Sequence, residues 1–245
     1  MSFLDKLRKA QIKTLLLRGF ALDLQNDERL FDLGDCYSSV LLLVASPWNE
    51  KKAFGHRSID PSDGNTIHNI SKTIIKTLQG DALNSLTEAM MENLQLVLRP
   101  QVVPKPKTPA WMSEGMYAFC YRVMFEAGYF TLFGKDPTGQ DAQKALILNH
   151  LDHFKQFDKI FPALVAGFPI HMFKTGHYAR EKLAEGLRLQ KLRKRDHISE
   201  LVRFLNDTLS ALDDTEKAKS FLAVLWASQA NTIPATFWSL FQMIR

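Results

Sequence analysis

The chain has 245 residues, of which 46% are hydrophobic and 23% are charged, and this globular composition excludes a disordered or collagen-like protein. Two cysteines cannot form a disulfide framework, and no stretch reaches the ~20 apolar residues that span a bilayer, so we expect neither a membrane anchor nor a secretion signal. The formal net charge of +5 is concentrated in residues 180–196, the basic stretch. A basic helix face can bind phosphate, an anionic membrane surface or an acidic protein partner, but a solvated face is the preferred interpretation. No aromatic residues interleave as a nucleic-acid site would require, so no nucleic-acid binding is expected.

The first half of the chain is predicted to be mainly helical. Residues 1–51 show a mixed pattern without a chemical motif, and 55–65 are rich in loop-forming residues. Apolar residues at helical spacing predict helices over 69–78 and 82–99. Four prolines within 100–109 then predict an extended connector.

The second half repeats the helical pattern. Helices are predicted over 111–133, 140–160, 177–209 and from about 213 to 245. The first of these is apolar all round, so we expect it to be buried and to end at Gly134. Residues 161–176 contain two Phe-Pro pairs and are expected to form a loop or a broken helix. The sequence therefore predicts a mainly α protein.

The last predicted helix contains a proline in its middle. Pro234 has no N–H for the carbonyl of Ala230, so the helix is expected to kink there. Small and polar residues, among them Asn231, precede the proline, and such an opening can hold water or a small ligand. The alternative is a purely structural kink, in which Thr232 bonds back to the backbone.

Other sequence patterns for catalysis are weak. His150 and His153 share a helix face at a spacing that can hold a metal, but no third ligand follows at a recognisable spacing. A surface or core role is the preferred interpretation of both histidines, and a metal-dependent enzyme remains a remote alternative. No glycine-rich phosphate loop and no nucleophile elbow occur in the sequence.

Four strings carry a resemblance to a known family. The run Ala-Ser-Gln-Ala-Asn-Thr at 227–232 resembles the distal I-helix signature of the cytochrome P450 haem-thiolate monooxygenases. The longer strings at 53–60, 161–173 and 226–245 are more specific and resemble the branch of that family that hydroxylates sterols at the 7-alpha position. At position 231 the wider family has an acidic residue, whereas this chain has asparagine. Asparagine at this position is similar to the branch that hydroxylates sterols at the 7-alpha position.

The resemblance implies the fold and its extent. It covers 52–245 and corresponds to a partial P450-like helical domain, from the B′ region through the I helix, behind a leader at 1–51 that does not resemble the family. The haem-thiolate half and most of the small sheets are expected to be missing. Neither Cys36 nor Cys120 lies in a glycine-rich loop that would present a thiolate to iron, so we expect this chain alone to be inactive and not to bind haem.

The resemblance also implies roles for residues of the last helix. Thr232 would act in catalysis by organising water and protons near bound dioxygen. Asn231 would present a polar group to the sterol. The same helix would line the substrate pocket with Trp226, Ala227 and Ala230. No residue of this chain is expected to bind a metal.

Partners and location follow from the same resemblance. The intact enzyme would use haem, cholesterol or a related sterol as substrate, and electrons from NADPH delivered by a reductase. It would reside at the endoplasmic reticulum membrane, with Phe161–Phe173 at the membrane surface near the substrate entrance. A related sterol hydroxylase, a prostacyclin-synthase-like member and a non-enzymatic lipid-binding helical protein remain alternatives.

Overall fold

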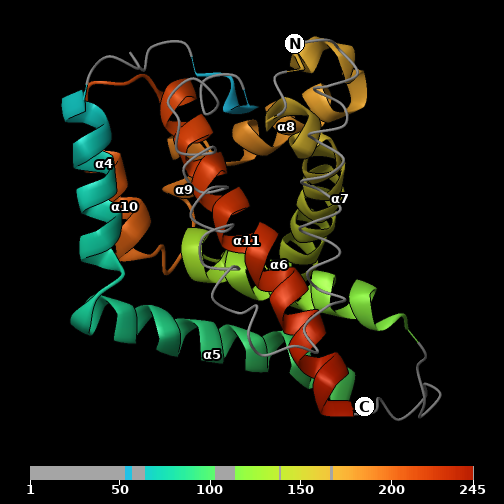
Figure 1. Ribbon diagram of the computed structural model, residues 1–245. Helices are drawn as coiled ribbons and strands as arrows, with labels where there is room; N and C mark the ends of the chain where they lie inside the picture. Colours follow the sequence, from blue (N-terminus) through green and yellow to red (C-terminus); the bar gives the residue numbers. More distant parts are fainter. Residues whose placement is uncertain (1–52, 57–63, 103–113, 138, 166–167, 245) are drawn as a thin grey trace, which may run out of the picture. The chain divides into compact units, whose positions relative to one another are not determined.

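The computed structural model describes most of the chain after residue 52 (Figure 1). The described residues are 53–56, 64–102, 114–137, 139–165 and 168–244. Helices dominate these ranges, and their one β-type pairing is an isolated bridge in which Lys135 and Asp196 exchange backbone hydrogen bonds of 2.9 and 3.0 Å. The expected mainly α fold is therefore confirmed. The leader expected at 1–51 lies outside the described residues.

The helices lie close to where the hydrophobic pattern predicts them. In chain order they are α4 (Gly64–Thr77), α5 (Gly80–Val102), α6 (Met116–Phe133), α7 (Gln140–Val165), the 3₁₀ helix η2 (Ile170–Met172), α8 (Lys174–Gly186), α9 (Leu189–Leu192), α10 (Glu200–Thr208) and α11 (Asp214–Ile244). α4 begins inside the expected loop at 55–65, and α5 extends three residues into the expected proline connector. Gly134 ends α6 as expected, with a positive φ of 74°.

Two boundaries in the second half were predicted wrongly. α7 does not end at residue 160 but continues through Pro162 to Val165. The fixed φ of proline is compatible with a helix, although the residue removes one backbone hydrogen bond. The single basic helix expected at 177–209 is three shorter helices. Ser199 starts the last of these by accepting a hydrogen bond from the Val202 N–H at 3.3 Å, an ordinary N-cap that the amphipathic pattern obscured.

The basic stretch is only partly a solvated face. Most of its lysines and arginines are exposed, but Arg180 and Arg195 are just 6% and 9% exposed. Arg195 lies between α9 and α10, where it donates to the Tyr129 hydroxyl at 2.9 Å and to the Gly186 carbonyl at 3.0 Å, so its charged side chain is buried. The solvated-face interpretation is wrong for these two residues, because their hydrogen bonds offset the cost of burial.

The contacts divide the chain into two compact units. Among the described residues, one unit combines 53–56 with 153–165 and 168–182, and the other contains 64–102, 114–137, 139–152 and 183–244. In the first unit Phe54 lies against Phe157 and Phe161, with ring centroids 5.9 and 5.6 Å apart. Arg180 joins the same two segments by donating to the Ala53 carbonyl at 3.4 Å.

The second unit is built around α6. This helix is buried along most of its length, as expected for a helix that is apolar all round, and Phe125, Tyr129 and Phe133 have essentially no exposed surface. α5 and α11 both pack against α6, and α10 packs beside α4. The helix that carries the predicted site residues, α11, is thus held by the buried centre of its unit.

Candidate functional site

From Leu225 onward, α11 has one buried face and one open face. Residues 218–222 are buried all round the helix, and after them the buried stripe consists of Leu225, Gln229 and Ile233 at a spacing of four. Ala227 and Asn231 lie on the opposite side and are exposed. The described part of the unit therefore packs against one side of this half of α11 and leaves the other side accessible.

The predicted site residues gather on and beside this open face. Trp226 and Ala230 are half-buried at its edge, whereas Ala227 and Asn231 are exposed. At about 100° per residue, the four side chains span an arc of roughly 140°. Thr232 is also exposed but leaves the helix about 100° further round than Asn231. The helix brings four of the five residues to one side, and their functional roles stay predictions.

The region around Pro234 remains helical. α11 is continuous from Asp214 to Ile244, and the expected kink stays a prediction. Thr236 donates its hydroxyl to the Thr232 carbonyl at 2.8 Å, whereas the Thr232 hydroxyl makes no hydrogen bond within the described residues. Among the described residues, the Thr232 hydroxyl therefore does not bond back to the backbone as the alternative expected.

Gln229 is a polar residue that the sequence analysis missed. It is only 2% exposed and lies in the buried stripe of α11, where its amide faces Gly128 of α6. Its Oε1 atom accepts no hydrogen bond within the described part of the chain. The signal was present in the sequence, because Leu225, Gln229 and Ile233 follow one another at a spacing of four on one helix face.

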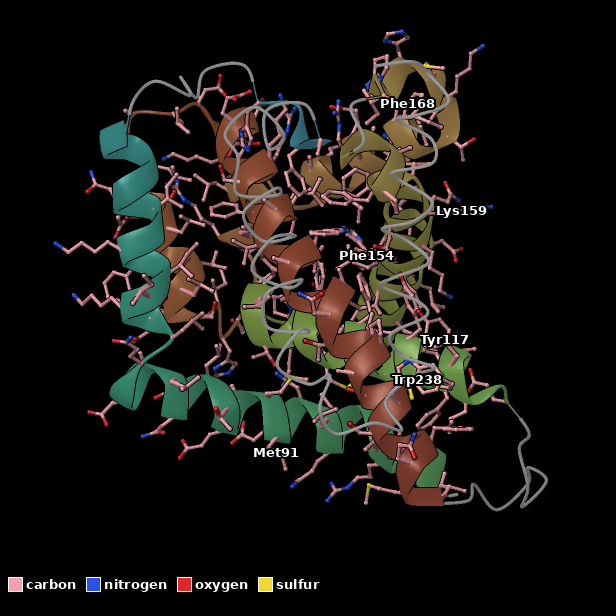
Figure 2. The ribbon with its side chains drawn as sticks, in the orientation of Figure 1. Met91, Tyr117, Phe154, Lys159, Phe168 and Trp238 are labelled. Carbon is pink, nitrogen blue, oxygen red and sulfur yellow. The ribbon has the colours of Figure 1, made fainter. Side chains whose placement is uncertain are left out.

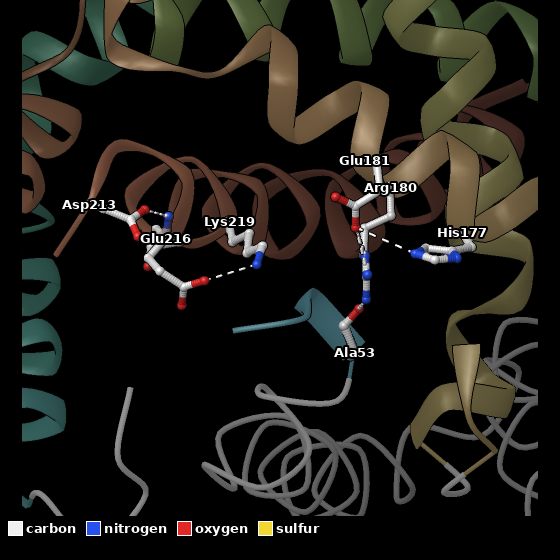
Figure 3. Close-up of polar contacts among 8 residues, drawn as sticks. Ala53, His177, Arg180, Glu181, Asp213, Glu216 and Lys219 are labelled. Carbon is white, nitrogen blue, oxygen red and sulfur yellow. Dashed lines mark hydrogen bonds and ion pairs between the residues drawn. The ribbon is translucent and has the colours of Figure 1, made fainter. Parts of the chain in front are cut away.

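A buried ion pair near the start of α11 was also missed (Figure 3). The Lys219 ammonium lies 2.9 Å from Glu216 Oε1, and both side chains are almost completely buried. Asp213 precedes the helix and accepts a hydrogen bond from the Glu216 N–H at 2.9 Å. Carboxylates at this end match the positive end of the helix dipole.

The two histidines on α7 have different aromatic neighbours. His150 is buried, its Nδ1 lies 2.8 Å from the Leu146 carbonyl, and its ring packs against Tyr129 at 5.3 Å. The His153 ring packs against Tyr178 at 5.8 Å. Each ring therefore has a packing role, and the described residues contain no group of three or more side chains suited to hold a metal ion.

Cys120 is the cysteine within the described residues. It is buried in α6, and burial raises the pKa of its thiol. A protonated thiol inside an apolar helix does not fit a thiolate ligand to haem iron. Cys120 therefore does not fit the role of the cysteine that ligates haem iron.

A pocket of about 220 Å³ lies elsewhere in the second unit. It lies among residues of α4, α5, α6 and the segment that enters α10, including Thr131, His197 and Arg203. None of the predicted site residues on α11 lines it. This pocket is therefore separate from the candidate site.

Comparison with known proteins identifies the family. The sequence model of the family "Cytochrome P450" matches residues 44–245. The chain belongs to the cytochrome P450 family. Over 194 residues it is 88% identical to "Cytochrome P450 7A1" of Sus scrofa, a match that covers 79% of this chain and 39% of that protein. Its identity to "Cholesterol 7-alpha-monooxygenase" of Cricetulus griseus is 71% over 197 residues, with the same coverage.

More distant relatives are also sterol-related by name. The chain is 33% identical over 202 residues to "5-beta-cholestane-3-alpha,7-alpha-diol 12-alpha-hydroxylase" of Sus scrofa, covering 79% of this chain and 38% of that protein. The chain spans about two fifths of the length of the curated relatives that it matches. No helix among the described residues combines the length and apolar character needed to cross a bilayer.

Proposed function

We propose that this P450 chain is part of a haem-thiolate monooxygenase that hydroxylates cholesterol at the 7-alpha position. The observation that carries the proposal is the contrast in identity. It is 71% to a protein named cholesterol 7-alpha-monooxygenase but 33% to a 12-alpha-hydroxylase of the same family, over similar lengths of this chain. The haem would supply dioxygen activation, with its thiolate ligand favouring O–O cleavage. "Full-length enzyme" below means a chain of the relatives' length that contains residues 44–245.

The open face of α11 supports a role in sterol binding. Ala227 and Ala230 have small side chains that leave room for a rigid, flat substrate, and the half-buried Trp226 adds an apolar wall. Asn231 is exposed on this face and carries an amide that can both donate and accept a hydrogen bond. A mostly apolar surface with one polar group is typical of sites that orient an apolar ligand.

We assign proton handling to Thr232. Its exposed hydroxyl makes no hydrogen bond within the described residues, so it can accept one hydrogen bond while donating another. Such a group can order a water molecule and pass a proton along the chain of hydrogen bonds. The 100° that separates Thr232 from Asn231 around the helix lets one residue handle protons while the other contacts the sterol.

The proposed partners are a reductase that delivers electrons from NADPH and a membrane that holds the sterol. We propose that the full-length enzyme works at the endoplasmic reticulum membrane and that the Phe161–Phe173 stretch meets the lipid surface through its later part, since Phe161 and Leu164 are buried. In support, Met172 of η2 is 54% exposed, and Phe168, labelled in Figure 2, is half-buried just before that short helix. Exposed apolar side chains at a helix turn can enter the boundary of a lipid layer.

The proposal is tested by mapping the product. The full-length enzyme is supplied with cholesterol, NADPH and the reductase, and the position of the new hydroxyl group is determined by mass spectrometry against standards. The proposal predicts 7-alpha-hydroxycholesterol as the main product. Hydroxylation at carbon 12 of a sterol, or turnover of only non-sterol lipids, would contradict it.

A further inference from the structure

α6 contacts α11 on both sides of Pro234. Before the proline, Gln229 of α11 faces Gly128 of α6. After the proline, the Phe237 ring packs edge-on against Tyr117 of α6, with centroids 5.2 Å apart and an interplanar angle of 83°. Tyr117 is labelled in Figure 2 together with Trp238, which also packs against Phe237, at 5.0 Å. The proline is therefore bracketed by two contacts with the same buried helix.

The contact before the proline is tight. A methyl group on Gly128 would overlap the Gln229 amide nitrogen and lie 3.3 Å from its Cδ atom, so α6 has room for this amide only because residue 128 is glycine. Gln229 is 2% exposed, and its Oε1 accepts no hydrogen bond within the described residues. Burying an unsatisfied amide oxygen costs about 1–3 kcal/mol. A leucine would avoid this cost, which suggests that the amide does more than fill space.

The segment between the two contacts carries the predicted chemistry. Asn231 and Thr232 lie two and three residues after Gln229, and Pro234 follows them. Because proline removes one hydrogen bond from the helix, this part of α11 is less constrained by its own backbone than the rest. Its direction and its rotation about the helix axis then depend on what holds it from outside, which among the described helices is mainly α6.

We propose that α6 acts as a brace for α11 and that Gln229, seated on Gly128, is a positioning residue for sterol hydroxylation. The seated amide fixes the rotation of α11 and thereby the directions in which Asn231 and Thr232 leave the helix. This inference rests on the proposed function of the open face. It assigns to α6 and Gln229 a part in selecting the position of hydroxylation, although neither touches the sterol.

The test is a double-variant comparison in the full-length enzyme. Gly128→Ala forces the Gln229 amide from its seat, Gln229→Ala removes the amide, and the double variant places the new methyl group where the amide was. We expect Gly128→Ala to lower kcat for cholesterol about tenfold, since small displacements of a positioned group cost rate. We also expect it to increase the share of products hydroxylated at other positions and of NADPH consumed without product. The double variant should recover most of kcat and of the product selectivity.

Controls separate positioning from folding. Gly115→Ala is the matched glycine control, because Gly115 has a φ of −61° and nothing within 4 Å of an added methyl group. Gln229→Ala only removes atoms, so it tests the contact between the Gln229 amide and Gly128 even if Gly128→Ala folds poorly. This variant should yield a broader set of hydroxylated products. If Gly128→Ala and Gln229→Ala both keep the product selectivity of the wild type, the proposal that α6 braces α11 through Gln229 is overturned. A double variant with lower kcat and selectivity than both single variants would overturn it as well. Failure of the wild-type enzyme to make 7-alpha-hydroxycholesterol would instead overturn the proposed function.

Discussion

Removing the Lys219 ammonium should destabilise the second unit more than any loss of a surface ion pair. Lys219 and Glu216 face each other at 2.9 Å, with side chains only 6% and 3% exposed. Breaking a buried pair by removing one partner costs about 3–5 kcal/mol, because the remaining charge stays in a medium that solvates it poorly. The same unit contains an exposed ion pair for comparison, in which Lys191 Nζ lies 3.4 Å from Glu185 Oε1 and the side chains are 51% and 46% exposed. Such exposed pairs are worth about 0–1 kcal/mol.

The assay compares Lys219→Met with Lys191→Met in the full-length enzyme. Both variants replace an ammonium by an uncharged chain of similar length, so the difference between them reports burial. Urea unfolding followed by circular dichroism should show a loss of about 3–5 kcal/mol for Lys219→Met and less than about 1 kcal/mol for Lys191→Met. Adding Glu216→Gln to Lys219→Met should recover part of the loss, because no buried charge of the pair is then left.

A particular result would refute this reasoning. If Lys219→Met and Lys191→Met change the unfolding free energy equally, the buried position of the Glu216–Lys219 pair has no energetic consequence. If adding Glu216→Gln lowers stability further by as much as it does in the wild-type background, the two charges are not coupled. Either result would show that the pair at the start of α11 does not help to hold this helix.

Further predictions concern α11 and α6. Thr232→Ala in the full-length enzyme should raise the NADPH consumed per sterol hydroxylated, because the proton-handling hydroxyl is lost; an unchanged ratio would count against that role. Asn231→Leu should weaken the sterol-induced spectral shift or change the hydroxylated position while leaving the fold intact. A variant whose sterol titration and product match those of the wild type would exclude the proposed sterol contact. Because burial raises the pKa of the Cys120 thiol, iodoacetamide should label it slowly in the native protein and rapidly in urea; fast native labelling at neutral pH would show that it is accessible.

The sequence predicted those parts of the fold that local patterns determine. α6 is apolar all round and ends at Gly134, and both features need only neighbouring residues to be recognised. The break in the basic stretch could not be predicted in this way. It accompanies the contacts of Arg195 with Tyr129 and with the Gly186 carbonyl, and Tyr129 is 66 residues away. Helical periodicity alone cannot show that an arginine turns inward to such a partner.

Some residues of the candidate site could be recognised from the sequence, whereas others depend on how the helices pack. Asn231 and Thr232 were recognised through resemblance to a family, because a short polar run on a helix does not define a chemistry by itself. Gln229 could have been found from spacing, as a polar side chain in an apolar stripe. Its neighbour Gly128 could not, because the seat depends on how α6 and α11 pack.

The central claim is that this chain belongs to an enzyme that hydroxylates cholesterol at the 7-alpha position through the open face of α11. The most direct measurement is the product distribution of the full-length enzyme with cholesterol, compared between wild type and Asn231→Leu. The account predicts 7-alpha-hydroxycholesterol as the main product of the wild type and a lower yield or a shifted position for the variant. A wild type that hydroxylates another carbon, or a variant with the same products and yield, would contradict it.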